Sequence, residues 1–410
     1  MIFQGLDLGE ALSAEAKLRP TEGGGKYPPE AKSFGKSSAE DVKRREMPPP
    51  PVTSCKSLKG GAKMRLCKAS SKLTGILMVS LVCGWAWLCN AQVKTGQPQV
   101  LKISHQWPGG TLEKGDFRDR LCRLFAQKAE QRTGGALKFE IYPASVLFKP
   151  QAQYDAMLKG ALDMSVFPLD YAAGKVPQFS ITLMPCIVKD LAQAMRWKDA
   201  PIGKEIERIS EENGMKILTW AWCGGGIASR GKPVRLPQDM KGLKARAAGK
   251  MFEKMLHDGA GAAITSMPSS EIYFALQTGV LDTCLTSSSS FESYRLYEQV
   301  QHYTSPRKTT IWYMLEPLVI SMATWKKLSP EHQKVLSEVG KELEKFALEE
   351  AIKDDAEVAQ LFQEKGVKVY DMTPEDFQVW LEVSKKTAWK EFAEKVKGGQ
   401  ELLNMALAVK

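Results

Sequence analysis

The stretch SPEHQKVLSEVGKELEKFALEEAIKDDAEVAQLFQEKG, residues 329–366, decides the fold. Ser329 followed by Pro330 is typical of a helix start, with serine at the cap and proline at the first position. No further proline interrupts the stretch, and Gly366 is its natural stop. Large apolar residues recur at helical spacing: Val335, Val339, Leu343, Phe346, Val358, Leu361 and Phe362. A continuous helix of this length measures roughly 50 Å. Because that exceeds one small domain, we expect the helix to contact two lobes.

The chain before this helix alternates between strand and helix patterns. Asp116 opens a helix whose apolar face includes Phe117 and Leu121, and Gly134 ends it. Further helices are expected at 151–159, 204–213 and 269–278, the last capped by Ser269 or Ser270. Strands are expected at 100–104, 137–141, 163–167, 216–220, 239–247, 264–267 and 318–322. This alternation predicts an α/β fold with helices on the faces of the sheets.

Residues 1–63 differ in composition from the rest of the chain. They are rich in Gly, Pro, Ser, Lys and Glu and contain few large apolar residues, so we expect disorder. The net charge of the chain is +10, but residues 1–91 hold 14 basic and 8 acidic side chains. The remaining residues therefore carry only +4. A basic pI says little about the folded part, and we expect no nucleic-acid partner.

A targeting segment is expected at residues 64–91. Basic residues after Met64 precede a 16-residue apolar stretch from Leu73 to Leu88, and Ala91 is a small residue before a cut. This is the layout of a cleaved secretory signal peptide. An uncleaved membrane anchor is the alternative, although the stretch is short against the roughly 20 residues that span a bilayer. Since the segment begins so late, we interpret residues 1–63 as mis-assigned upstream sequence.

The motifs of common catalytic and metal sites give little support to an enzyme. Gly226 to Lys232 matches the start of a phosphate-binding loop, but Pro233 stands where Ser or Thr should bind magnesium. G-x-S-x-G, H-E-x-x-H and C-x-x-C are absent from the sequence, and the four histidines form no helical ligand pair. We therefore expect no metal and no cofactor. Four cysteines follow the signal peptide, and buried free thiols are a better interpretation than disulfides.

Two polar features follow expected strands. Arg246 ends one strand among small residues that let a ligand approach, and a guanidinium binds a carboxylate through two parallel hydrogen bonds. Taken alone, a solvated surface arginine is the simpler interpretation. Thr286 to Ser290 lie at the carboxyl end of another strand, where ligands bind in open α/β sheets. From the sequence alone, a polar loop that caps the next helix is the favoured interpretation of these hydroxyls.

An ordered series of motifs resembles one family of binding proteins. The series is SHQWPGG at 104–110, EIYPASVL at 140–147, MLKGALDMSV at 157–166, LPQDMKGLKARAAG at 236–249, SSEIYFALQTGVLD at 269–282 and EPLVISMATWKKLSPEHQ at 316–333. Each motif is weak singly, but six in this order resemble the DctP-type solute-binding proteins of TRAP (tripartite ATP-independent periplasmic) transporters. The likeness runs from about residue 100 to 395.

The resemblance implies a two-lobed periplasmic-binding-protein fold, type II-like, with the long helix spanning both lobes. We expect the first lobe at 98–222 plus 313–345, the second at 223–312 plus 346–395, and a C-terminal tail at 396–410. The family captures small carboxylates between its lobes in the periplasm and delivers them to membrane transporter subunits. Its carboxylate-binding arginine corresponds to Arg246.

The expected ligand contacts extend beyond this arginine. The remaining candidates are Ser287, Thr286, Ser269, Trp107, Tyr171, Trp222 and Phe167, with the aromatic side chains as walls around the carbon chain of the ligand. Many relatives carry Asn or Glu where this sequence has Thr286 and Ser287, and sialic-acid binders carry arginine where it has Gly225. These departures disfavour sialic acid and leave the organic acid unidentified.

Two other functions remain open at this point. A hydrolase would use Ser287 or Cys223 as nucleophile and would need a histidine or carboxylate beside it. A sensor module would present its ligand-bound form to a membrane receptor. Ligand capture for transport, without catalysis, is the function that the sequence favours.

Overall fold

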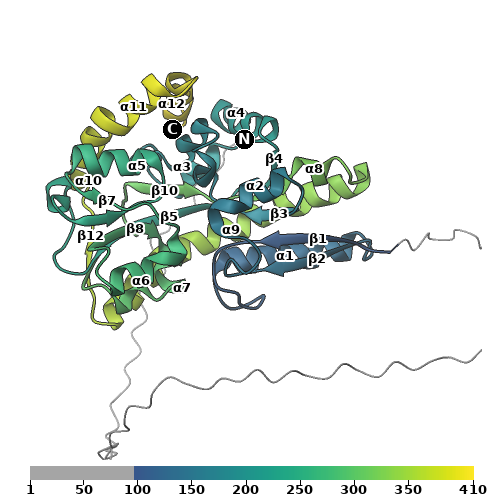
Figure 1. Cartoon of the computed structure of the whole chain (residues 1–410), viewed down its shortest axis with the longest axis horizontal. Helices are drawn as coiled ribbons and strands as arrows, with labels where there is room; N and C mark the ends of the chain where they lie inside the picture. The colour runs from purple at the N-terminus through teal and green to yellow at the C-terminus, as the bar shows by residue number, and fades with distance from the viewer. Residues whose placement is uncertain (1–96) are drawn as a thin grey trace, which may run out of the picture. The chain divides into compact units, whose positions relative to one another are not determined.

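The computed structural model describes residues 97–410, which contain two β-sheets and the helices around them (Figure 1). The expectations for residues 1–63 and for the signal peptide at 64–91 lie outside the described residues. Mixed strands and helices confirm the predicted α/β class.

The first sheet has five strands in the order β2-β1-β3-β11-β4. Strand β1 runs parallel to β2 and β3, whereas β11 runs antiparallel to β3 and β4. The bounds are β1 Gln99–Ser104, β2 Leu137–Tyr142, β3 Met164–Val166, β4 Met215–Thr219 and β11 Leu318–Ser321.

The second sheet has seven strands in the order β12-β9-β5-β8-β6-β7, with β10 paired to β5. The bounds are β5 Trp222–Ser229, β6 Lys244–Arg246, β7 Ala263–Ile264, β8 Thr283–Ser287, β9 His302–Ser305, β10 Trp312–Leu315 and β12 Lys368–Asp371.

Helices cover the sheets. The α-helices are α1 Phe117–Arg132, α2 Gln153–Leu158, α3 Leu191–Arg196, α4 Pro201–Glu212, α5 Lys250–Lys254, α6 Ile272–Gln277, α7 Ser288–Ser293, α8 Met322–Trp325, α9 Pro330–Glu364, α10 Pro374–Ser384, α11 Lys390–Lys395 and α12 Gly399–Leu407. Two 3₁₀ helices, η2 Leu169–Ala172 and η3 Pro177–Leu183, follow β3.

Two extended connections join the sheets. One links β4 to β5, and the other links β10 to β11. The two connections lie side by side, and the Glu316 amide of one donates to the Ala221 carbonyl of the other at 2.8 Å. Strand β10 belongs to the second sheet through its pairing with β5, whereas the expected ranges assign residues 313–345 to the first lobe. The lobe boundaries as a whole remain a prediction.

Helix α9 confirms the expectation of one long helix. The Ser329 side chain caps it by accepting from the His332 amide at 3.2 Å. Along its length the helix packs on β4 of the first sheet and on β5, β9 and β12 of the second. Gly340 faces the backbone of Leu218 in β4, where an added Cβ would lie 2.1 Å from the carbonyl oxygen. The glycine thus allows close packing of the helix on the sheet.

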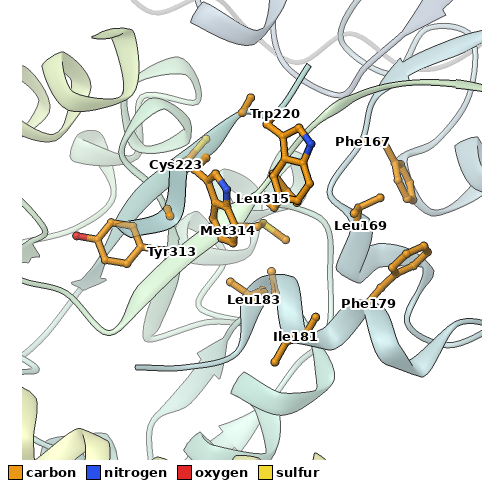
Figure 2. Close-up of a cluster of buried hydrophobic side chains, with 14 of the residues drawn as sticks. Phe167, Leu169, Phe179, Ile181, Leu183, Trp220, Cys223, Tyr313, Met314 and Leu315 are labelled. Atoms are coloured by element: carbon orange, nitrogen blue, oxygen red, sulfur yellow. The ribbon is translucent and has the colours of Figure 1, made fainter. Parts of the chain in front are cut away.

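An apolar core fills the region around the connections (Figure 2). Helix η3 contributes Phe179, Ile181 and Leu183 to this cluster, and it packs on β10, which contributes Met314 and Leu315. All five side chains are at most 2% exposed. The core therefore supports the strands that connect the two sheets.

Three local expectations were wrong. Residues 239–247 are not one strand: Pro237 starts a 3₁₀ turn through Met240, and only Lys244–Arg246 pairs in the sheet. Likewise only Ile264 of 264–267 is in a strand. The Ser269 side chain does not cap the following helix. Ser269 is the first residue of a 3₁₀ turn that precedes α6. The expected tail at 396–410 contains α12, which packs on α4 and η3 through Leu402, Leu403 and Ala406.

Two further findings concern the cysteines and the helices. Cys122, Cys186, Cys223 and Cys284 are free and buried, as expected. None of the helices in residues 97–410 is long and apolar enough to cross a membrane.

Candidate ligand-binding site

Arg246 lies at the end of β6, where segments attached to the two sheets meet. Ala247 and Ala248 follow it and are buried. Gly249 has a φ of +87°, which favours glycine, and a Cβ there would lie 2.1 Å from Oδ2 of Asp170 in η2. Small residues thus let η2 approach the end of β6 closely, and their expected role in admitting a ligand stays a prediction.

The Arg246 guanidinium is held in place by neutral oxygens. Its side chain is buried, with the residue only 1% exposed. Nε donates to the Met267 carbonyl at 3.0 Å and Nη1 to the Leu285 carbonyl at 2.7 Å. Within residues 97–410 it forms no ion pair with an Asp or Glu side chain, and its third partner is the Tyr171 hydroxyl, 3.4 Å from Nη2. The cation is therefore buried and oriented without a carboxylate partner.

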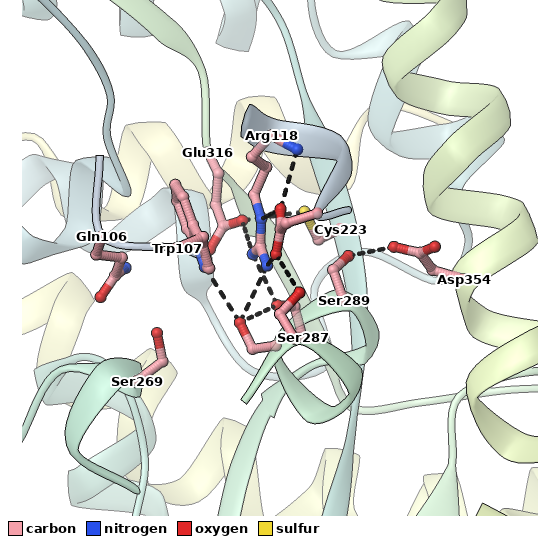
Figure 3. Close-up of polar contacts among 12 residues, drawn as sticks. Gln106, Trp107, Arg118, Cys223, Ser269, Ser287, Ser289, Glu316 and Asp354 are labelled. Atoms are coloured by element: carbon pink, nitrogen blue, oxygen red, sulfur yellow. Dashed lines mark hydrogen bonds and ion pairs between the residues drawn. The ribbon is translucent and has the colours of Figure 1, made fainter. Parts of the chain in front are cut away.

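The Tyr171 hydroxyl is a junction between both sides of the site. Besides Arg246 it contacts the backbone amide of Ser269 at 3.3 Å and Nε2 of Gln106 at 3.5 Å. Gln106 is 3% exposed, and its Oε1 has no hydrogen-bond partner. Figure 3 shows Gln106 and Ser269 on the same side of Trp107, and the Tyr171 hydroxyl lies between them through these two contacts. Several groups that bind polar ligands thus converge here.

A cavity of about 270 Å³ adjoins this junction. Its lining includes Tyr171 and Met267, and the other lining residues are Gln151, Asp170, Ala173, Gly174, Ala247, Ala248, Gly249, Lys250, Glu253 and Ser266. Burial raises the pKa of Asp170 to about 7, and its Oδ2 has no hydrogen-bond partner. The cavity is large enough for an organic acid of a few carbon atoms.

A second polar cluster surrounds Arg118 in the first turn of α1 (Figure 3). Its Nε and Nη2 donate to the two carboxylate oxygens of Asp116, at 2.8 and 2.7 Å. Nη1 donates to Oε2 of Glu316 at 2.7 Å. The guanidinium also lies over the ring of Trp107, 3.9 Å from its centroid. Unlike Arg246, Arg118 is saturated by two carboxylates of the protein.

The serines expected to bind ligand instead contact this second cluster or α9. Ser287 accepts from Nη1 of Arg118 at 2.9 Å and donates to Ser290 at 2.9 Å. Ser288 and Ser289 donate to Asp355 and Asp354 of α9. These side chains are buried at the start of α7 rather than forming an exposed loop.

The structure divides the predicted site residues between the Arg246 site and the Arg118 cluster, and it places two of them in neither. Tyr171 and Ser269 lie at Arg246, and Phe167 packs edge-on against Tyr171 with ring centroids 6.4 Å apart. Trp107 and Ser287 lie in the Arg118 cluster. Thr286 is buried in β8 opposite Gly226. Trp222 packs against Trp197, the residue after α3, at 5.3 Å between centroids.

Gly225 lies against an aromatic ring. A Cβ at this position would lie 2.4 Å from the ring of Trp312 and 2.2 Å from the Thr286 carbonyl oxygen. Neighbouring atoms therefore leave no space for a larger side chain at Gly225. This agrees with the lack of the arginine that sialic-acid binders carry at this position.

The geometry does not favour the hydrolase alternative. In the described part of the chain, no histidine contacts Ser287 Oγ or Cys223 Sγ. Burial raises the pKa of the Cys223 thiol, and the neighbouring Glu316 carboxylate, 3.1 Å from Sγ, raises it further. A thiolate nucleophile is thus disfavoured. The described residues also include no group of three His, Cys, Asp or Glu side chains suited to a metal.

Sequence reasoning missed Gln106, Asp116, Arg118 and Glu316. One signal was present: Arg118 is a cation in the first turn of a helix, where the helix dipole is unfavourable to positive charge. Such a residue is expected to have a specific anionic partner. The two carboxylates that supply it come from distant parts of the sequence, so only the fold reveals the cluster.

Comparison with protein families gives one match across most of the described chain. Residues 104–395 match the family model DctP, described as bacterial extracellular solute-binding protein, family 7. A solute-binding protein from Albidiferax ferrireducens is 49% identical over 310 residues, which cover 76% of this chain and 91% of the relative. The C4-dicarboxylate-binding periplasmic protein DctP of Rhodobacter capsulatus is 27% identical over 289 residues, covering 70% and 84%.

Solved structures show the same fold. A TRAP periplasmic solute-binding protein from Rhodoferax ferrireducens, with bound malonate, matches with a TM-score of 0.73 at 49% identity and covers 75% of this chain and 96% of that chain. A second, from Sulfurospirillum deleyianum DSM 6946 with bound succinate, matches with a TM-score of 0.67 at 22% identity, covering 76% and 99%. The latter likeness concerns the fold alone.

Proposed function

Because the chain belongs to the DctP family of bacterial extracellular solute-binding proteins, we propose that Arg246 is the anchor by which it captures a small carboxylate. The protein is a solute-binding protein of the TRAP type with the two-lobed fold of that family. Its ligand, its site residues and its transporter partner are the subject of the proposal.

One observation carries the proposal: Arg246 is a buried guanidinium without a carboxylate partner in the described residues. Burying a charge is costly unless it is paired. A ligand carboxylate supplies the missing anion, and the bonds to Met267 and Leu285 orient the guanidinium before the ligand arrives. Arg118 provides an internal contrast, because Asp116 and Glu316 already neutralise it.

The groups around Arg246 suit the same ligand. The Tyr171 hydroxyl accepts from Nη2 of Arg246 and from the Ser269 amide, so its own O–H can donate to a ligand carboxylate beside the guanidinium. Phe167 packs against Tyr171 and gives the site an apolar wall. The open cavity of about 270 Å³ beside Tyr171 and Ala247 has room for an acid of a few carbon atoms, although Arg246 itself is not among its lining residues. Malonate, the ligand in the Rhodoferax relative, is of this size and charge.

The transport role follows from the family. DctP-family proteins bind their solutes outside the cytoplasm, and we propose that this chain is exported by cleavage after residue 91 and delivers its acid to TRAP membrane subunits. N-terminal sequencing of exported protein tests the cleavage, with Gln92 expected at or near the first position. A mature chain that retains residues before Met64 would contradict it.

Calorimetry on the purified mature protein tests the ligand class. We expect malonate and other short organic acids to bind and malonamide, which has the same shape without negative charge, not to bind. A ligand at one hundred times its Kd should also stabilise the fold by about 2.7 kcal/mol. Tight binding of malonamide, or binding of none of the acids, would contradict the proposed carboxylate recognition.

A further inference from the structure

The Arg118 cluster connects segments that belong to different sheets. Asp116 and Arg118 begin α1, which follows β1 and packs on β2 of the first sheet. Ser287 ends β8 of the second sheet, and Ser290 and Ser293 lie in the next helix, α7. The cluster therefore spans the boundary between the sheets (Figure 3).

Four hydrogen bonds of the Arg118 cluster cross this boundary, and beside them the Tyr294 hydroxyl donates to the Gln106 carbonyl at 2.9 Å. Arg118 donates to Ser287 at 2.9 Å and to Ser290 at 3.2 Å. The Trp107 indole donates to Ser290 at 3.3 Å, and Ser293 donates to Oδ2 of Asp116 at 2.6 Å. On the second-sheet side, each partner is a neutral hydroxyl.

The charged members of the cluster lie on the other side of that boundary. Asp116 is two residues from Arg118, and Glu316 lies in the connection between β10 and β11, where its amide bonds to the parallel connection at Ala221. If the sheets move apart, Arg118 keeps both carboxylates and loses only hydroxyl partners. Because no buried charge is left unpaired, this contact can break and form again reversibly.

We propose that Asp116 and Arg118 form a latch that docks on Ser287, Ser290 and Ser293 when the site closes and so sets the fraction of closed protein. This rests on the proposed function, since closure then encloses the ligand at Arg246. A latch of this kind changes the apparent affinity for every ligand by the same factor, because affinity scales with the population of the binding-competent state. It acts without contacting the ligand, so Ser290 and Ser293 are positioning residues.

The double variant Ser290→Ala/Ser293→Ala tests the latch. It removes three of the four crossing bonds of the cluster and keeps the charges. The matched control is Ser289→Ala, which breaks a serine–aspartate bond from the same helix to Asp354 of α9. Calorimetry with malonate and with succinate should show both affinities reduced about tenfold by the double variant and within twofold of the parent for the control. Affinities within twofold of the parent for the double variant would overturn the proposal, and so would unequal losses for the two acids, which would indicate direct ligand contact.

A ligand-free readout separates this proposal from the proposed function. Dyes are attached at Val146→Cys and Phe274→Cys. The native side chains at these two positions are 70% and 66% exposed, and they lie on segments of different sheets. Single-molecule energy transfer between them reports the closed fraction without any ligand. The double variant should lower the closed-to-open ratio by the same factor as the affinities. An unchanged closed-to-open ratio would overturn the latch, whether or not the protein binds malonate.

Discussion

The Tyr171 hydroxyl lies 3.4 Å from Nη2 of Arg246. Tyr171 belongs to η2, which follows a strand of the first sheet, and Arg246 ends a strand of the second. The contact therefore joins the two sides of the site at the proposed carboxylate anchor. A ligand carboxylate bound here would contact both residues, so both determine affinity and each can be tested separately.

Replacement of Arg246 should abolish most of the affinity for a carboxylate. Charge-assisted hydrogen bonds contribute about 1.5–3 kcal/mol each, so Arg246→Ala should cost about 3 kcal/mol or more, at least about a hundredfold in Kd. Arg246→Lys should restore little, because an ammonium lacks the planar fork. Arg208→Ala, at an exposed arginine of α4, is the control. Calorimetry decides the matter: an Arg246→Ala protein that stays folded and binds within threefold of the parent rules out the anchor.

Removal of the Tyr171 hydroxyl should have a smaller effect. Tyr171→Phe keeps the ring that packs on Phe167 and removes a neutral donor, which is worth about 1 kcal/mol or roughly fivefold in affinity. The melting temperature should stay close to that of the parent, since the hydroxyl bonds are long. A loss as large as that of Arg246→Ala would instead mean that the hydroxyl orients the arginine.

The sequence predicted the fold where local patterns sufficed. The helix at 330–364, the β1–α1–β2 unit and the strand-end position of Arg246 all follow from periodicity, caps and glycine stops. Arg246 itself became a candidate through its small neighbours together with the resemblance to the DctP family, since the residues alone favoured a solvated surface arginine. Its burial did not follow from the sequence, since the carbonyls that hold it come from positions 267 and 285.

For two residues predicted to contact the ligand, the sequence could not show the neighbours in space. Ser287 looked like a ligand donor, but the distant Arg118 engages its hydroxyl. Trp222 looked like a wall of the site, but it packs on Trp197, the residue after α3. In both cases the deciding partner is far away in the sequence, and a single sequence shows the residue type without its neighbour in space.

Buried Asp170 should make stability depend on pH. Burial raises its pKa from 3.8 to about 7, and the nearby Glu253 adds to the shift while Lys250 and Arg246 oppose it. Between these pKa values the folded protein binds a proton that the unfolded chain has released. The free energy of unfolding therefore falls as pH rises from about 4 to 7 and changes little above that range.

The variant Asp170→Asn isolates this contribution. It removes the ionisable group, so it should stabilise the protein by about 1 kcal/mol or more at pH 8 and by little at pH 4. Urea unfolding at both pH values measures the difference. Asp199→Asn, at an exposed aspartate, is the matched control and should give the same small change at both. Because Asp354 and Asp355 also have pKa values raised to about 7 by burial, some pH dependence should remain in Asp170→Asn.

Gly340→Ala should destabilise the protein even though alanine favours helices. A methyl group at this position would lie 2.1 Å from the Leu218 carbonyl oxygen and 2.7 Å from its carbon. Those are backbone atoms of β4, so the strand and α9 must separate. Alanine gains about 1 kcal/mol in helix propensity, but overpacking costs about 1–3 kcal/mol, and a rigid backbone contact places the cost at the upper end. We therefore expect a net loss of about 1–2 kcal/mol in urea unfolding. Glu349→Ala, with a side chain 64% exposed on the same helix, should change stability by less than about 0.5 kcal/mol. A Gly340→Ala protein as stable as the parent would mean that α9 does not need this close contact with the first sheet.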